Sequence, residues 1–130
     1  MIKEEYKHSD ITQKIIGCAF LVSNKLKPGY PESVFQRALE IELNKIDLKI
    51  NREITKPIYY DSQIIGHRRL DFVVNDTVLI ELKAISALDS GHAAQILNYL
   101  EIFEIEIGLL INFGSQKIEI KRFTNNKLNR

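Results

Sequence analysis

The sequence predicts an α/β sandwich, in which a mixed central β-sheet is flanked by helices in the order ααβββαββ. Two observations predict this class. Apolar residues recur at helical spacing in some stretches, whereas others are rich in β-branched and aromatic residues, as strands are. In addition, one helical stretch separates the third strand-like stretch from the fourth, which is the arrangement of a parallel crossover.

Three helices are expected, over residues 9–26, 31–46 and 89–103. Ser9 is the expected N-cap of the first helix, and the sequence KPGY ends that helix. Pro31 suits the first turn of the second helix. Asp89 or Ser90 is expected to cap the third.

Five strands are expected, over residues 48–60, 64–74, 78–83, 107–113 and 117–120. The fourth of these is almost continuously apolar, which is typical of a strand buried on both faces. The fifth alternates apolar and charged residues, so we expect it to be half exposed. Residues 1–8 and 124–130 are expected to be loose ends.

Composition limits the classes of function. The chain has 130 residues, 45% hydrophobic and 27% charged, so we expect a single domain over residues 1–130. The net charge of +1 does not favour a polyanion bound by bulk electrostatics, and nucleic-acid binding would need a local patch. A single cysteine, Cys18, excludes an internal disulfide and favours a reducing compartment. With a charged N-terminus and no long apolar stretch, we expect a cytoplasmic protein without a membrane partner.

The loop around Asn75 decides which face of the sheet carries Asp71 and Glu81, because side chains alternate across a strand. A two-residue turn would mix charged and apolar side chains on both faces. A three-residue loop at residues 75–77, or an equivalent bulge, makes one face wholly apolar. The pairs on that face would be Leu70 with Leu82, Phe72 with Ile80, and Val74 with Val78.

The same register collects four charges on the opposite face, with Asp71 opposite Glu81 and Arg69 opposite Lys83. Opposed carboxylates have Cβ atoms roughly 5 Å apart and repel each other, so a compensating charge is expected. A divalent cation would supply it, and two acids, an amine and a metal suit phosphodiester hydrolysis. The alternative is that Arg69 and Lys83 simply neutralise the two acids at a polar end of the hairpin.

Asp71 followed by the triplet ELK at residues 81–83 resembles the signature of the PD-(D/E)XK nuclease superfamily. Residues 29–35, GYPESVF, resemble the motif that names the GxxExxY proteins, a branch of that superfamily, with Phe35 in place of the tyrosine. The likeness extends over residues 16–113 and includes the stretches LDFVV, VLIELKA, HAAQILNYL and GLLINF. It implies a restriction-endonuclease-like fold. Leu70 stands where the superfamily often has a proline.

The resemblance implies a nuclease dependent on Mg²⁺ or Mn²⁺ that acts on DNA or RNA. By this resemblance, Asp71, Glu81 and the backbone carbonyl of Leu82 ligate the metal, and Lys83 is the catalytic lysine. Glu32 resembles an additional acid near the same metal, and its spacing places it on the inward face of its helix. The alternative for Glu32 is that it only favours the helix N-terminus through the helix dipole.

Gln95 and Tyr99 resemble a QxxxY element, in which Gln95 would bind a metal-bound water or orient Lys83. The alternative for this pair is a polar edge on an amphipathic helix. Arg68, Arg69 and Tyr99 are the expected nucleic-acid contacts.

Three hypotheses of function follow. The first is the metal-dependent nuclease. The second is a catalytically inactive module of nuclease fold that binds a protein or a nucleic acid, because a fold alone does not establish activity. The third is an enzyme subunit that cuts only within a homodimer or a larger assembly.

Overall fold

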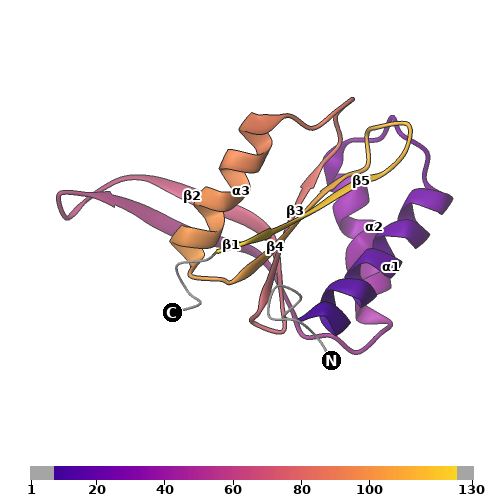
Figure 1. The fold of residues 1–130 in the computed structure, drawn as a ribbon, viewed down its shortest axis with the longest axis horizontal. Coiled ribbons are helices and arrows are strands. Elements are labelled where there is room, and N and C mark those ends of the chain that lie inside the picture. Colours follow the sequence, from indigo (N-terminus) through magenta and orange to yellow (C-terminus); the bar gives the residue numbers. More distant parts are fainter. Residues whose placement is uncertain (1–7, 126–130) are drawn as a thin grey trace.

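A computed structural model describes residues 8–125, in which helices cover both faces of one β-sheet (Figure 1). The helices are α1 (Ser9–Lys25), α2 (Glu32–Asn44) and α3 (Ser90–Phe103). The strands are β1 (Ile50–Tyr60), β2 (Gln63–Val74), β3 (Val78–Lys83), β4 (Ile107–Asn112) and β5 (Glu119–Thr124). This order confirms the predicted fold class. No helix within the described range is both long enough and apolar enough to cross a bilayer.

The five strands form one sheet in chain order, β1-β2-β3-β4-β5. Strands β3 and β4 are parallel, and the other neighbouring pairs are antiparallel. Helix α3 connects the two parallel strands, so the predicted crossover is confirmed. The carboxyl ends of β3 and β4 therefore lie at the same edge of the sheet.

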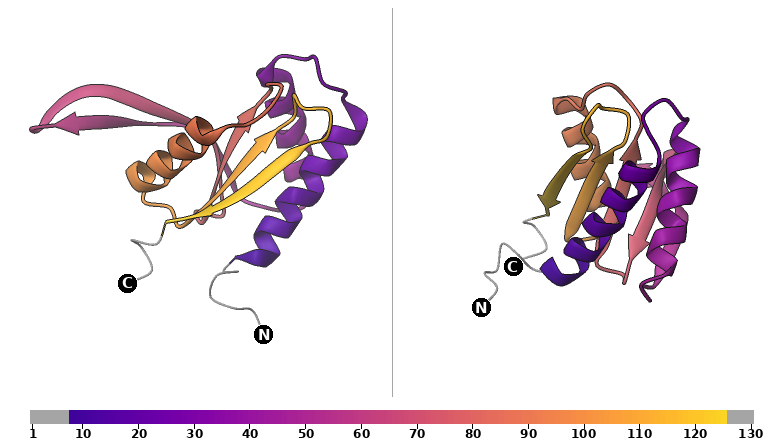
Figure 2. Two further views of the ribbon diagram at one scale, coloured as in Figure 1. Left: turned by 45° about the horizontal axis from the view of Figure 1, so that its top comes forward. Right: turned by 90° about the vertical axis from the view of Figure 1, so that its right-hand side faces the viewer.

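Two hydrophobic cores lie on opposite faces of the sheet, with α1 and α2 on one face and α3 on the other (Figure 2). The core under α1 and α2 includes Ile15, Phe35, Leu39, Phe72, Ile80, Leu82 and Ile111. The core under α3 includes Leu70, Val73, Leu79, Ile96, Tyr99, Leu100 and Leu110. Each of these large side chains contributes roughly 1.5–3 kcal/mol of stability on burial. Strand β4 sends residues into both cores, as its continuous apolar pattern predicts.

The observed helix ends agree only in part with those predicted from the sequence. Asp89 caps α3, because its Oδ1 accepts hydrogen bonds from the backbone N–H groups of Gly91 at 2.9 Å and His92 at 3.3 Å. The prediction for Ser9 is wrong. Residue His8 holds the N-cap position of α1 without a side-chain cap, and Ser9 is already helical. Pro31 is the N-cap of α2 and lies just outside its first turn.

The loop between β2 and β3 has the predicted length. Val74 pairs with Val78 and Phe72 pairs with Ile80, which leaves residues 75–77 as the loop. Asn75 has φ 50° and Asp76 has φ 56°. Both residue types tolerate this left-handed conformation better than others do, which explains why they stand in the loop.

The predicted pairing of Leu70 with Leu82 is wrong. The ladder between β2 and β3 runs from Val74↔Val78 only to Phe72↔Ile80. Beyond that point β2 leaves β3 and continues with β1 as a long hairpin that projects from the body of the fold (Figures 1 and 2). The strand twists there, beside Glu53 of β1 with φ 56°, so Leu70 packs in the α3 core while Leu82 packs in the other.

The predicted position of Arg69 opposite Lys83 is also wrong, for the same reason. Arg69 pairs with Thr55 of β1 in the ladder. Its guanidinium forms an ion pair of 2.9 Å with Oε1 of Glu53 on that strand. Because β2 diverges from β3, Arg69 pairs with an acid of its own hairpin and does not lie opposite Lys83. The charge of Lys83 acts instead on Asp71 and Glu81.

The last strand lies further along the chain than predicted. β5 comprises Glu119–Thr124, and Thr124 pairs with Ile107 of β4. The backbone N–H of Asn125 donates to the carbonyl of Glu106 at 2.7 Å. Residues 124 and 125 are thus not loose, because the buried strand β4 needs its backbone groups paired along its whole length. The other expected loose residues, 1–7 and 126–130, lie outside the described residues.

Candidate active site

The site lies where the backbone ladder between β2 and β3 ends and carboxylates replace it. Oδ2 of Asp71 accepts a hydrogen bond from the backbone N–H of Leu82 at 2.7 Å. Oε1 of Glu81 accepts one from the backbone N–H of Asp71 at 3.3 Å. Each acid thus satisfies a backbone group on the neighbouring strand, and the two carboxyl groups lie side by side.

Burial dominates the electrostatics of this pair. Glu81 is only 6% exposed. Desolvation and then the charge of Asp71 raise the pKa of Glu81 to about 9. The pKa of Asp71 is also raised by burial, although the Leu82 N–H and the charges of Lys83 and Arg69 oppose the rise. Burial and mutual repulsion therefore favour protonation within the pair, most strongly at Glu81.

Lys83 is half-buried at the end of β3, two residues after Glu81. Its positive charge lowers the pKa of Asp71, of Glu81 and of Glu32, so the ammonium acts electrostatically on all three carboxyl groups. Its carbonyl accepts a hydrogen bond from the backbone N–H of Phe113 at 2.9 Å, which fixes the strand end.

Helix α2 forms the other wall of the site. A pocket of about 310 Å³ is lined by Glu32, Ser33, Gln36, Arg69, Asp71 and Glu81. Nε2 of Gln36 donates to Oδ1 of Asp71 at 3.3 Å. The sequence reasoning missed Gln36, although its place four residues after Glu32 put both on one helix face.

Glu32 lies at the first residue of α2 and is exposed, so the expectation that it packs inward is wrong. It nevertheless lines the pocket. Partial burial of its carboxyl group and repulsion from Asp71 raise its pKa. At the start of the helix the side chain projects past the core into the mouth of the pocket, which reconciles its exposure with its proximity to the acids.

On the α3 side of the site, Tyr99 is buried and Arg68 lies over its ring, with the guanidinium carbon 5.4 Å from the ring centroid. Burial and then the charge of Glu81 raise the pKa of Tyr99, so the phenol lies near the carboxyl pair. Gln95 is half-buried one turn earlier on α3 and is not among the residues that line the pocket. Tyr99 does not line the pocket either, but the charge of Glu81 acts on its phenol.

The donor groups of the site suit a hard cation. Among residues 8–125, no three His, Cys, Asp or Glu side chains are arranged as a metal site. Two adjacent carboxylates satisfy the requirement of Mg²⁺, which commonly takes one or two carboxylates and completes its shell with water and phosphate. Sulfur and imidazole ligands, which zinc prefers, do not line this pocket.

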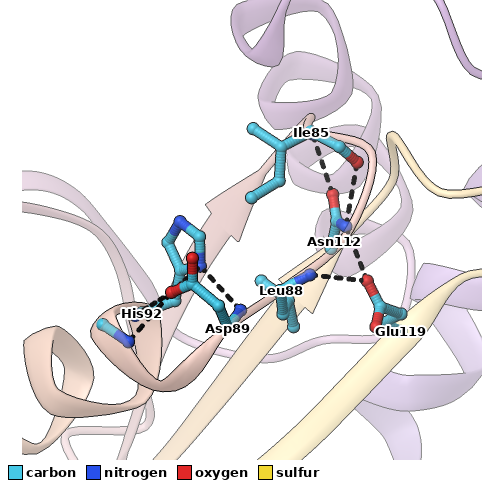
Figure 3. Close-up of polar contacts among 7 residues, drawn as sticks. Ile85, Leu88, Asp89, His92, Asn112 and Glu119 are labelled. Atoms are coloured by element: carbon cyan, nitrogen blue, oxygen red, sulfur yellow. Dashed lines mark hydrogen bonds and ion pairs between the residues drawn. The ribbon is translucent and has the colours of Figure 1, made fainter.

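A buried amide holds the segment that follows Lys83 (Figure 3). Oδ1 of Asn112 accepts from the backbone N–H groups of Ile85 and Gly114, both at 3.0 Å. Its Nδ2 donates to the carbonyl of Ile85 at 3.0 Å and to Oε1 of Glu119 at 2.8 Å. The same Glu119 oxygen accepts from the backbone N–H of Leu88 at 3.0 Å. This network positions the chain between the end of β3 and the start of α3.

Replacing Asn112 by alanine should lower the free energy of unfolding by about 1–3 kcal/mol, because it leaves buried backbone groups of Ile85 and Gly114 without partners. Urea denaturation measures this. Asn24→Ala on the exposed surface of α1 is the control, with an expected change within about 0.5 kcal/mol. Equal stability of the two variants would contradict the structural role of the amide.

The family model described as the PD-(D/E)XK nuclease superfamily matches residues 9–123 of the chain. The chain belongs to this superfamily. The model matches the superfamily as a whole, so membership of its GxxExxY branch stays a prediction. The matched range contains Glu32 and both carboxylates of the pair, together with Lys83.

One solved structure, described as "Crystal structure of SSO0001", shares the fold of this superfamily member with a TM-score of 0.59 and 19% sequence identity. The likeness covers 72% of this chain and 50% of that chain, so the superfamily member spans half the length of the solved protein. At this identity the likeness shows the fold alone. No curated protein matches the sequence.

Proposed function

We propose that this superfamily member is a metal-dependent nuclease that hydrolyses phosphodiester bonds in DNA or RNA. The observation that carries the proposal is the pair of Asp71 and Glu81, held side by side in a pocket that Glu32 and Gln36 of α2 also line, with the charge of Lys83 acting on both acids. A structural ion pair would leave both acids ionised against cations. A carboxyl pair kept partly protonated by burial and mutual repulsion is instead typical of a functional site.

Each residue has a role that its position supports. Asp71, Glu81 and the backbone carbonyl of Leu82 would hold Mg²⁺ or Mn²⁺, and Gln36 steadies Asp71 through its hydrogen bond. A bound divalent ion polarises a phosphoryl oxygen and lowers the pKa of a bound water. Lys83 would stabilise negative charge that develops on the phosphate or position the attacking water.

Other residues in and around the pocket would bind water or the substrate. Glu32, at the mouth of the pocket, can accept a hydrogen bond from water. Arg69 is exposed at the same mouth and has Glu53 as its partner, so its charge is available to a phosphate only in competition with that acid. Arg68 of β2 lies over the ring of Tyr99 of α3, and the charge of Glu81 acts on that tyrosine. Gln95 has the weakest support as a catalytic residue, because it neither lines the pocket nor is, as Lys83 is, among the groups that shift the pKa of Asp71 and Glu81.

Calorimetric titration with Mn²⁺ and Mg²⁺ tests the proposal. We expect the wild type to bind either ion, and Asp71→Ala and Glu81→Ala to weaken binding more than about a hundredfold, since even outer-shell changes cost 10–100-fold. Asp76→Ala, which removes an exposed acid in the loop between β2 and β3, is the matched control and should bind as the wild type does. Equal binding by all four proteins would overturn the metal assignment.

Cleavage assays on single-stranded and duplex DNA and RNA complete the experiment. Metal-dependent cleavage that is lost in both alanine variants supports the nuclease. Metal binding without cleavage of any substrate would favour the inactive interaction module.

A further inference from the structure

Two cations face each other across the projecting hairpin. Lys56 of β1 and Arg68 of β2 are direct partners in the antiparallel ladder, so their side chains leave the sheet on the same face. Like charges in this relation repel and destabilise a sheet. Neither side chain forms an ion pair with an acid within the described range 8–125, so the repulsion is not offset by a carboxylate there.

Helix α3 holds both cations with neutral groups. The Lys56 ammonium lies 5.8 Å from the centroid of the Phe103 ring, and the Arg68 guanidinium carbon lies 5.4 Å from that of Tyr99. Nε of Arg68 also donates to Oδ1 of Asn98 at 3.3 Å. Aromatic faces attract cations without neutralising them. The arrangement therefore orients two positive charges and leaves both charges uncompensated.

The position of this pair relates it to the active site. The pair lies where the β1–β2 hairpin passes α3 before it projects from the body of the fold (Figures 1 and 2). Arg68 lies over the Tyr99 ring, and the charge of Glu81 also acts on the Tyr99 phenol, so Tyr99 links the cation pair electrostatically to the carboxyl pair. A polynucleotide bound at the carboxylates and running toward α3 would pass these cations.

We propose that Lys56, Arg68 and Asn98 form a subsite that binds a backbone phosphate of a polynucleotide next to the cleaved bond. This inference rests on the proposed nucleic-acid substrate. The guanidinium can donate two parallel hydrogen bonds to phosphate oxygens, and the ammonium adds a point charge. The Asn98 oxygen already accepts from Arg68, so the groups with which Asn98 would bind a phosphate are its amide N–H donors. A bound phosphate would neutralise the repulsion between the cations.

Binding is measured without divalent metal, in EDTA, so that cleavage does not occur. The probes are fluorescent single-stranded and duplex DNA and RNA oligonucleotides, titrated with the full chain at several salt concentrations. We expect Lys56→Met and Arg68→Met each to weaken binding about five- to twentyfold and to reduce the slope of log affinity against log salt by about one. Lys56→Arg should retain most of the affinity. Lys14→Met on α1, on the opposite side of the sheet, is the matched control.

Two further measurements separate binding from folding and from catalysis. The melting temperature of Lys56→Met should stay close to that of the wild type, because losing the ring contact and losing the repulsion oppose each other. Mn²⁺ affinity should also be unchanged. A melting temperature that falls with unchanged affinity for the probes would mean that the pair is structural and would overturn the subsite.

The outcomes distinguish this inference from the proposed function. If the wild type cleaves nucleic acid but Lys56→Met and Arg68→Met bind like the wild type, the subsite is wrong and the nuclease stands. If both variants lose affinity while no protein cleaves, the subsite stands and the nuclease fails. If the wild type binds none of the probes, the subsite is overturned.

Discussion

Lys83→Met should reduce metal-dependent phosphodiester cleavage about a hundred- to a thousandfold. The positive charge of the ammonium acts on Asp71 and Glu81 and lowers the pKa of both. Removing a preorganised charge that faces the developing charge of a reaction costs this much in well-studied sites. Methionine keeps the unbranched stem of the half-buried side chain, so the fold should be retained. Initial rates on the best substrate, at saturating Mn²⁺, measure the effect.

Two comparisons make the result specific to Lys83. Lys14→Met removes an equivalent charge from the exposed surface of α1 and should cleave at the wild-type rate. The Mn²⁺ affinity of Lys83→Met should remain within about tenfold of wild type, because the carboxyl pair that would hold the ion is intact. If Lys83→Met cleaves at the wild-type rate, the lysine only neutralises the charge of the two acids, which is the alternative considered for the hairpin.

In buffer without divalent metal, Glu81→Gln should raise the free energy of unfolding at pH 8 by roughly 2–4 kcal/mol. In the folded state the pKa of Glu81 is raised to about 9 from an ordinary 4.5, chiefly by burial. The unfolded chain releases this proton near pH 4.5, whereas the folded chain retains it. Stability is therefore lost progressively as the pH rises from about 4.5 to about 9. Glutamine cannot ionise and still donates to Asp71, so the variant avoids this loss.

Urea denaturation from pH 4 to pH 9 in EDTA measures the difference. The stability curves of wild type and Glu81→Gln should meet near pH 4 and separate as the pH rises. Glu104→Gln, at the exposed end of α3, is the control and should follow the wild type. Parallel curves for wild type and Glu81→Gln would show that the acid is not held protonated in the fold.

Added Mn²⁺ should reduce the difference in stability between Glu81→Gln and the wild type. Metal binding requires both carboxylates ionised and stabilises only the folded wild type, by about 2.7 kcal/mol at a metal concentration of a hundred times Kd. Glu81→Gln offers one charged ligand fewer and should gain much less. Mn²⁺ binding to the wild type should release the proton held by the carboxyl pair. In calorimetric titration, the binding heat should therefore depend on the ionisation enthalpy of the buffer.

The local pattern of apolar and polar residues was sufficient to predict most of the fold and the pairing of Asp71 with Glu81. Alternation of apolar residues on either side of Asn75 allowed one loop length that keeps a face apolar, and the structure has that loop. The same alternation put Asp71 and Glu81 side by side. Asp89 was identifiable as a cap, because capping depends on a few consecutive residues.

The tertiary structure alone decided where β2 parts from β3. Alternation assumes that a strand keeps the same neighbours and a constant twist, whereas β2 pairs with β1 along its whole length but loses β3 beyond Phe72. Loss of that neighbour placed Leu70 in the other core and Arg69 beside Glu53. It also opened the space that Gln36 and Glu32 enter from α2, which no periodicity along β2 could indicate.

The sequence by itself determined the order of the elements and the meeting of two acids with an amine, because these follow from periodicity and loop length over some fifteen residues. Only the tertiary structure brought α3 against the hairpin and set Lys56 and Arg68 over its aromatic rings. That contact joins residues far apart in the chain, and its geometry depends on sheet twist and on the packing of a whole helix, which no local pattern encodes.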